Sequence, residues 1–261
     1  MSKFDLIIDP PVMNAAGSLG FAPDPGGPIP LKSLGAFVTN PISLGTRSPA
    51  HTPQQINFPG GFLQHTGYPN PGLREAIRRY APSWGRSPVP VLVHLLCNSP
   101  GEIPRMVSRL EGLDGVIGIE LGLPPEVDVQ EAKSFASTLA AAAGGEFPVV
   151  VRLPLERAAY LAPVVTESEL AAISLGPPRG LLPGSQGSLV RGRMYGPGIF
   201  PLALAAVGGL ASMGLPIIGG GGVYQPAQVQ AMLAAGAIAV QLDVVLWRGT
   251  WPPTGLSPYT W

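Results

Sequence analysis

The chain has 261 residues, of which 46% are hydrophobic, with 16 basic and 16 acidic side chains and one cysteine. The single cysteine excludes a disulfide scaffold, and the balanced charge offers no basic footprint for a nucleic acid. Glycine and proline together make up about a quarter of the chain, a share that can signal disorder. Disordered chains, however, combine low hydrophobicity with high net charge, which is the reverse of this composition. The composition therefore predicts a folded, loop-rich protein with few surface charges.

Eight short apolar runs, separated by glycine, proline or asparagine breaks, predict eight parallel strands. Strands that are buried on both faces read as nearly continuous hydrophobic segments. The runs cover residues 12–16, 36–39, 89–96, 116–121, 149–153, 171–175, 216–219 and 239–242. Helices are expected between most of them, at residues 71–80, 100–110, 127–142, 201–213 and 226–235. Several of these stretches begin with proline, which is favoured in the first turn of a helix.

Eight strand-then-helix units in this length predict an α/β fold, a single-domain (β/α)8 TIM barrel over residues 1–261. The alternative is an open doubly wound sheet, which normally carries its glycine-rich phosphate turn after the first strand. Here four consecutive glycines, residues 219–222, follow the seventh strand, where barrels commonly bind phosphate. Residues 41–67 and 176–198 are too long for plain connections, and we expect them to be loops that cover the site.

The sequence shows no export signal, and its longest uncharged run is interrupted. The first ten residues include Lys3, Asp5 and Asp9, so they lack the apolar centre of a signal peptide. The uncharged run 200–222 is long enough to cross a bilayer, but its prolines and glycines favour a buried helix at 202–213 and then a strand. The single thiol fits a reducing compartment. We expect a cytoplasmic protein with no membrane span and no nucleic-acid partner.

Eight segments match, in order, those of one known family. Residues 11–20 (PVMNAAGSLG), 67–72 (GYPNPG), 148–154 (PVVVRLP) and 216–223 (PIIGGGGV), with 35–54, 115–125, 196–204 and 235–246, resemble the dihydroorotate dehydrogenases, which are FMN-binding barrels. Each match alone is weak, and their collinear order over nearly the whole chain carries the resemblance. It implies an FMN-dependent oxidoreductase that oxidises a CH–CH unit, of the kind used in pyrimidine biosynthesis.

The resemblance also assigns roles to residues. Two lysines that face the flavin in the family are replaced by Asn40 and Arg152, and Arg152 keeps a positive charge that can stabilise a reduced, anionic flavin. Asn70 matches an asparagine that hydrogen-bonds the substrate. The residues that we expect to be catalytic are Arg152 and Asn70, from the resemblance, and Cys97, from its own place at the end of the third strand. The cofactor-binding residues expected are Ala16, Gly17, Asn40, Arg152, Ser174, Gly196, Gly221 and Gly222. No spacing of histidine, cysteine or acidic residues suggests a metal site.

The four glycines have two interpretations. Glycines let backbone amides approach and surround an anion, so Gly221 and Gly222 are expected to bind the FMN phosphate. A tight strand-to-helix turn that needs a positive φ would also require glycine.

The departures from the family pattern fall where the chemistry takes place. Gly122 replaces an asparagine, and Pro124 and Pro125 occupy the region of the Cys or Ser base, although proline cannot accept a proton. The loss of a general base typically costs ~10²–10⁴-fold in rate. Asp243 stands where a small, glycine-type phosphate contact is expected, and a carboxylate repels a phosphate unless it is protonated or turned away. The catalytic loop is therefore interpreted as degenerate.

Cys97 is the candidate to replace the missing base, and other polar residues of the strands and of the long loop, among them His51 and His65, are weighed beside it. Cys97 ends the third strand, and it is either a displaced base, which would need a nearby cation, or simply a buried thiol. His94, in the same strand, points to one face of the sheet, either into the barrel or into the core. Glu120 is expected to pair with Arg152 if it points into the barrel.

Two functions from different classes remain open. The first is the flavin-dependent oxidoreductase, and the second is an inactive barrel that serves as a binding or assembly subunit. The low charge and the proline-rich tail at 251–261 fit the second, because exposed tryptophans often mark a docking surface. Arg191 and Arg193 either contact an anionic ligand or form an exposed pair. In both cases we expect a small-molecule ligand and a homo-oligomer or a larger complex.

Overall fold

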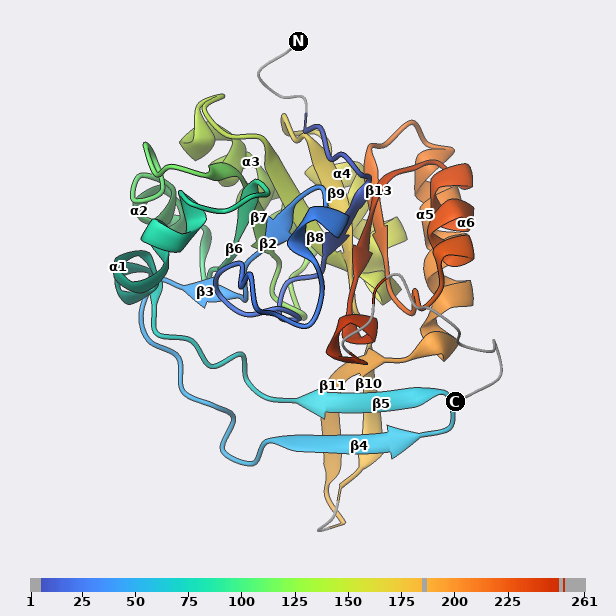
Figure 1. Cartoon of the computed structure of the whole chain (residues 1–261). Helices are drawn as coiled ribbons and strands as arrows, with labels where there is room; N and C mark the ends of the chain where they lie inside the picture. The colour runs from blue at the N-terminus through green and yellow to red at the C-terminus, as the bar shows by residue number, and fades with distance from the viewer. Residues whose placement is uncertain (1–5, 185–186, 249–250, 252–261) are drawn as a thin grey trace.

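A closed barrel of parallel strands forms the centre of the protein (Figure 1). The computed structural model describes residues 6–184, 187–248 and 251. The barrel strands are β1 (Val12–Asn14), β2 (Phe37–Val38), β6 (Val91–Leu96), β7 (Val116–Gly122), β8 (Val149–Pro154), β9 (Ala172–Gly176), β12 (Ile217–Gly220) and β13 (Ala237–Leu242). Their order is β1-β13-β12-β9-β8-β7-β6-β2. The predicted TIM barrel is confirmed, and each of the eight predicted strands overlaps one of these.

The barrel closes between β1 and β2 with the help of a side chain. A parallel bridge joins Met13 to Ala36. Asn14 then takes the place of a backbone ladder, because its Nδ2 donates to the Val38 carbonyl at 2.7 Å and its Oδ1 accepts from the Val38 amide at 2.8 Å. A buried amide that satisfies both backbone groups of its neighbour allows two very short strands to remain paired.

Helices surround the barrel, as expected for strand-then-helix units. They are α1 (Leu73–Trp84), α2 (Ile103–Val107), α3 (Val129–Ala143), α4 (Ala158–Val165), α5 (Phe200–Ala211) and α6 (Pro226–Ala234), with short 3-10 turns at Leu31–Ser33, Pro100–Glu102, Leu155–Arg157, Pro197–Ile199 and Val244–Arg248. The sequence analysis missed α4, which carries Pro163 in its interior. No described helix is long and apolar enough to cross a membrane, and the run 200–222 contains α5 and β12.

The two segments expected to be loops over the site contain β-hairpins, so the expectation of loops was wrong, although both segments do contribute to the wall of the cavity at the barrel mouth. The first contains β3 (Ile42–Ser43), which pairs with β6, followed by β4 (Gln54–Phe58) and β5 (Gly61–His65). The second forms β10 (Arg179–Pro183) and β11 (Leu189–Tyr195). Together they make a four-stranded antiparallel sheet, ordered β10-β11-β5-β4, which lies at one end of the barrel (Figure 1). Its strands are half-exposed and partly polar, so a search for continuous apolar runs does not find them.

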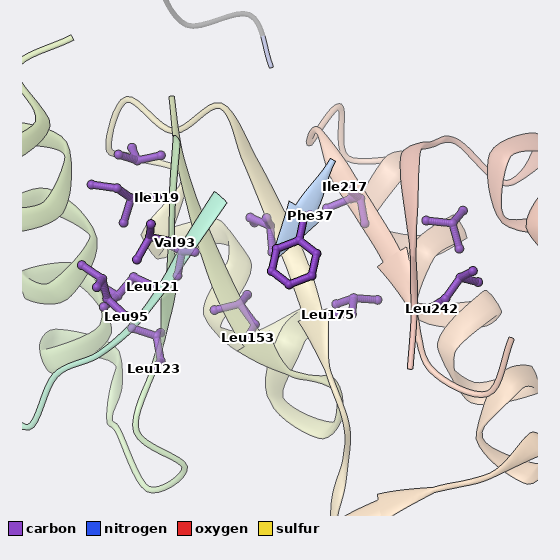
Figure 2. Packing of buried hydrophobic residues seen from close by; sticks show 14 of the residues in the cluster. Phe37, Val93, Leu95, Ile119, Leu121, Leu123, Leu153, Leu175, Ile217 and Leu242 are labelled. Carbon is purple, nitrogen blue, oxygen red and sulfur yellow. The ribbon is translucent and has the colours of Figure 1, made fainter. Parts of the chain in front are cut away.

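Apolar side chains form two separate clusters on the two faces of the barrel strands. The outer cluster joins strand residues such as Val93, Ile119 and Leu153 to the helices, and Figure 2 shows its strand side chains. The inner cluster fills the barrel with Met13, Val38, Leu92, Val150, Ala172, Ile218 and Ala239, among others. Because side chains alternate along a strand, the residue two positions after an inner one returns to the inside. That rule places a second, polar layer above the apolar one: His94, Arg152, Ser174 and Gln241.

Candidate active site

A cavity of about 390 Å³ lies where β6, β7, β8 and β9 end, and the antiparallel sheet contributes to its wall. Its lining includes four arginines and two histidines: Arg47, Arg152, Arg179, Arg193, His65 and His94. Among the residues that the structure describes, no aspartate or glutamate belongs to the lining. A concave site at the carboxyl ends of barrel strands is where this fold performs chemistry, and a lining of this charge attracts anions.

Two of these arginines have unused hydrogen-bond donors. Arg152 is 8% exposed and makes no hydrogen bond to the described residues; its nearest charged partner is Glu120, with 3.8 Å between Nη1 and Oε2. Arg179 likewise has an enclosed Nε without a partner, and burial and the charge of Arg193 lower its pKa. A guanidinium offers five donors, and leaving them unpaired in a buried place is costly. Both side chains are thus arranged to bind an anion.

Below the cavity, Glu120 is the centre of a buried polar cluster. Its Oε2 lies 2.6 Å from Nδ1 of His94. Its Oε1 accepts hydrogen bonds from Ser174 Oγ and Gln241 Nε2, both at 2.6 Å. Burial alone would raise the pKa of this carboxyl, but the hydrogen bond with His94 and the charge of Arg152 outweigh it and hold the pKa at about 2.

The pairing of Glu120 with Arg152 was expected, whereas the shorter contact with His94 was not. His94 and Glu120 are register partners across β6 and β7. The signal was present in the sequence, because each residue interrupts an apolar strand at an inward-facing position. Strand register, which decides that the two side chains meet, was not available from the sequence.

Arg193 belongs to the wall that the antiparallel sheet gives to the cavity. Its guanidinium carbon lies 3.7 Å from the centre of the Tyr68 ring. Its nitrogens donate to Tyr195 Oη at 3.1 Å and to Thr66 Oγ1 at 3.0 Å. Arg191, two residues earlier, is exposed and lies 3.5 Å from Glu126. The two arginines are therefore not an exposed pair, and only Arg193 reaches the cavity.

The glycine-rich turn after β12 offers its amide to a carboxylate of the same chain. Gly222 N donates to Asp243 Oδ2 at 3.4 Å, and Val244 N donates to Asp243 Oδ1 at 2.6 Å. Burial raises the pKa of Asp243 to about 6, against the effect of these two amides. Gly222 has φ +69°, and a Cβ there would lie 2.5 Å from the amide nitrogen of Phe200. The turn therefore needs glycine for its own packing, and its amides also form a small anion cradle.

The other residues expected to bind the cofactor lie around the barrel mouth. Ala16 is buried within the inner cluster, and Gly17 beside it is exposed. Asn40 Oδ1 accepts from the Gly20 amide at 3.1 Å, which fixes the turn that follows β1. Ser174 is engaged with Glu120, as described above. A Cβ at Gly196 would lie 2.3 Å from a backbone oxygen of the chain, and at Gly221 it would meet Ile199 at 3.3 Å.

Asn70 and Cys97, expected to be catalytic, are both held by neighbouring protein groups. Asn70 Oδ1 accepts from the Ser43 amide and hydroxyl at 3.1 and 3.0 Å, and its side chain is absent from the cavity lining. Cys97 lines the cavity, but its Sγ donates to Met106 Sδ at 3.5 Å. Burial and the charge of Glu102 raise the pKa of this thiol to about 12, which is opposite to what a base needs.

A closed parallel barrel with a polar cavity at the strand ends, and backbone donors after its last two strands, is the arrangement of a ligand-binding TIM barrel. Within that class, the family model described as dihydroorotate dehydrogenase matches residues 4–254. The chain therefore belongs to the dihydroorotate dehydrogenase family, whose members bind FMN. Among the described residues, no group of three metal-ligating side chains could hold a metal ion.

Curated relatives and solved structures agree with this membership. The chain is 29% identical over 252 residues to the catalytic subunit of dihydroorotate dehydrogenase B (NAD(+)) from Citrifermentans bemidjiense, covering 89% of this chain and 82% of the relative. The corresponding subunit from Desulforudis audaxviator is 28% identical, covering 90% and 82%. A DHODH from Eimeria tenella in complex with ferulenol has a TM-score of 0.74 at 13% identity, covering 94% of this chain and 80% of that one. The structural likeness supports the fold.

The donor groups fit the phosphate of FMN in their chemistry, but one of the chain's own side chains competes for them. The side chain of Asp243 already accepts hydrogen bonds from the amides of Gly222 and Val244, so backbone donors of the kind that bind an anion are present after β12 and β13. A phosphate can bind the same amides only after Asp243 has moved away. At the cavity, Arg152 offers a positive charge with unused donors to an anionic ligand. When bound, FMN would supply a hydride acceptor.

Proposed function

We propose that this protein is an FMN-dependent oxidoreductase of the dihydroorotate dehydrogenase type, which oxidises the CH–CH unit of a small carboxylate such as dihydroorotate. The observation that carries the proposal is the guanidinium of Arg152, which lines the cavity with unused donors and no hydrogen bond to the described residues. A planar guanidinium binds a carboxylate through two parallel hydrogen bonds, so it orients the substrate as well as attracting it.

The surrounding residues bind the rest of the ligand and the cofactor, and they enclose the cavity. Arg179 provides a second cation for the anionic ligand. Arg193 and Tyr68 form part of the cavity wall, where they limit the access of water. The amides of Gly222 and Val244 would hold the phosphate of the cofactor once Asp243 has turned away. Asn40, Ala16 and Gly17, in and after β1 and β2, are proposed to lie beside the flavin.

The test is the visible absorbance of the purified protein, before and after incubation with excess FMN. The proposal expects a bound-flavin spectrum that bleaches when dihydroorotate is added without oxygen. Arg152→Lys keeps the charge but loses the planar fork, so it should raise the dihydroorotate concentration needed for bleaching. A protein that binds FMN but is not bleached by any small carboxylate would contradict the proposed substrate class.

A second function is favoured by a specific observation. The phosphate cradle holds Asp243, and Pro124 and Pro125 stand where a base is expected, so the barrel can also act as a binding or assembly subunit without turnover. The absence of bound flavin at excess FMN, both in the unaltered protein and in Asp243→Gly, would favour this alternative.

We further propose that the protein works in the cytoplasm within a complex. The curated relatives are named catalytic subunits, which supports a partner subunit for this chain as well. Trp251, the first residue of the proline-rich tail, is buried against the outer cluster, and residues 252–261 lie outside the described part of the chain. Size-exclusion chromatography with light scattering would distinguish a homo-oligomer from a monomer that awaits a different partner.

A further inference from the structure

We propose that His94, oriented by Glu120, is the proton acceptor of this cavity, and that the group it deprotonates is a C–H next to a carbonyl in a small carboxylate. The proposal rests on the cavity that the proposed function uses, but it needs no flavin. It assigns a role to two residues that lie outside the positions where the family pattern is degenerate.

The contact between the two side chains fixes which ring nitrogen carries the proton. Nδ1 of His94 lies 2.6 Å from Oε2 of Glu120. Two donors, from Ser174 and Gln241, already occupy the other oxygen of the carboxyl, which favours its ionised form. An ionised carboxylate only accepts hydrogen bonds, so Nδ1 must be the donor. The lone pair of the neutral ring is then on Nε2, in the arrangement by which a carboxylate orients a catalytic histidine.

The free nitrogen faces the cavity. His94 lines the cavity, and its Nε2 makes no hydrogen bond within the described residues. It is not one of the fully enclosed nitrogen or oxygen atoms that lack a partner, so it reaches open space. Gly122 provides that opening: a Cβ at this position would lie only 2.8 Å from Nε2 of His94. The glycine that replaces the family's asparagine is therefore the residue that leaves the base uncovered.

The charges around the ring suit a base that is neutral before it reacts. Burial lowers the pKa of His94, and the charge of Arg152 on β8 adds to that effect, whereas Glu120 on β7 opposes it. On the β2 side, Thr39 accepts a hydrogen bond from the His94 backbone amide and leaves the ring free. A histidine that remains unprotonated near neutral pH can accept a proton from a substrate.

The proton transfer needs no group beyond those in the cavity and the ligand. Arg152 and Arg179 hold the carboxylate of the ligand. The C–H bond breaks, its proton forms a bond to Nε2, and its electron pair is delocalised onto the neighbouring carbonyl oxygen as an enolate. The imidazolium that results is stabilised by Glu120. Return of a proton to the same carbon restores the ligand, with solvent hydrogen incorporated after exchange on His94.

Chemical modification tests the exposure of Nε2 without relying on catalysis. The chain has three histidines, so the double variant His51→Gln/His65→Gln leaves only His94 to react with diethyl pyrocarbonate. We expect one modified histidine by mass spectrometry, and at least tenfold slower modification in the presence of orotate. Nitrogen-15 spectra of the histidine-labelled variant should show Nδ1 protonated and Nε2 unprotonated at pH 7. An unreactive ring, or a proton on Nε2, would overturn the proposal.

Isotope exchange tests the reaction itself. Dihydroorotate incubated with the protein in D₂O should take up deuterium at the carbon next to its ring carbonyl, whether or not flavin is bound. His94→Gln should slow the uptake by ~10²-fold or more, which is the size of a lost general base. His51→Gln, which alters an exposed residue, should leave the uptake unchanged. Uptake that is absent, or equally fast in His94→Gln, would overturn the role of His94 even if FMN-dependent bleaching occurs.

Two further variants, Gly122→Ala and Glu120→Gln, separate the role of His94 from that of Glu120. The alanine methyl group would lie only 2.8 Å from Nε2, which is too close, so it would displace the ring from its place at the cavity, and both modification and deuterium uptake should fall while far-UV circular dichroism is unchanged. Glu120→Gln removes the charge that stabilises the imidazolium and should flatten the pH profile of the uptake. Uptake by Gly122→Ala at the unaltered rate would show that the proton leaves by another route.

Discussion

The carboxylate of Asp243 accepts a hydrogen bond from the backbone amide of Gly222, with 3.4 Å between Oδ2 and the nitrogen. Its other oxygen lies 2.6 Å from the amide of Val244. These amides follow β12 and β13, where a TIM barrel commonly binds phosphate. The side chain thus occupies two amides that the proposed phosphate site would use, and we expect it to weaken the binding of FMN.

Removing that side chain should strengthen FMN binding. Asp243→Gly frees the amides of Gly222 and Val244 and removes a negative charge from the phosphate site. We expect the Kd for FMN, measured by quenching of flavin fluorescence, to fall about tenfold or more, because tenfold requires only about 1.4 kcal/mol. Asp243→Asn, which removes the charge but keeps the bulk, should give a smaller gain. Equal affinity in all three proteins would show that the phosphate binds elsewhere.

Asp243 should also make the protein less stable as the pH rises from about 4 to about 6. Burial raises its pKa from 3.8 to about 6, so the folded state holds a proton that the unfolded state has released in this range. The free energy of unfolding should therefore decrease by up to about 3 kcal/mol across it. Asp243→Asn should lack this decrease in urea titrations at pH 4 and pH 7. A parallel pH dependence in the two proteins would refute the assignment.

Glu120 should have the opposite effect on stability to that of Asp243: it should make the protein more stable as the pH rises, and it should do so at lower pH. Its pKa is held at about 2, below the ordinary value of 4.5, so its contribution to stability is complete above about pH 4.5 and is lost as the pH falls toward 2. A shift of this size corresponds to about 3 kcal/mol. Glu120→Gln should therefore flatten the acid side of the stability curve and leave the change between pH 4 and pH 6 intact. Loss of both features would mean that the variant has disturbed the whole polar layer.

The barrel could be predicted from the sequence because its strands are continuous apolar runs. The run at 91–96 reads VLVHLL and pairs with a similarly apolar run at 116–122. The antiparallel sheet was not predicted, because polar and apolar residues alternate along its strands. Gln54, Gln64 and Arg193 are examples of the polar residues. Its pairing also joins residues far apart in the chain, such as Arg193 and Gln64, and no local pattern specifies that register.

The site was only partly predictable for the same reason. Arg152 was expected at the site because it replaces a lysine that faces the flavin in the family that the sequence resembles, and it lines the cavity. From the sequence, His94 is expected either inside the barrel or in the core, and its pairing with Glu120 is not predicted. That contact depends on strand register and on the space left by Gly122. The sequence predicts that Asp243 repels a phosphate. The hydrogen bond from Gly222 to Asp243 depends on how β12 pairs with β13, and no local pattern specifies that pairing.

Replacing Arg152 should affect both ligand binding and stability. Arg152→Met keeps the volume but removes the cation nearest to buried Glu120, whose Oε2 lies 3.8 Å from Nη1. Breaking a buried ion pair from one side typically costs about 3–5 kcal/mol, and we expect the lower value because the contact is long. Orotate binding, measured by calorimetry, should weaken at least tenfold. The double variant Arg152→Met/Glu120→Gln should regain stability but not orotate affinity; recovery of both would place the anion elsewhere.

Arg193 should matter more for the antiparallel sheet than its neighbour Arg191. Arg193 lies over Tyr68 and hydrogen-bonds Tyr195 and Thr66, so Arg193→Met leaves these polar groups without their partner. The loss of one buried hydrogen bond to a charged group costs about 1.5–3 kcal/mol. We expect Arg193→Met to lower the free energy of unfolding by about 3 kcal/mol in total. Arg191→Met, the matched control on the same strand, removes only an exposed pair and should leave the unfolding midpoint unchanged. Hydrogen exchange should show faster opening of β5 and β11 in Arg193→Met alone. Equal protection in the two variants would show that the sheet is held by its backbone ladder, and that the arginine contributes only to ligand binding.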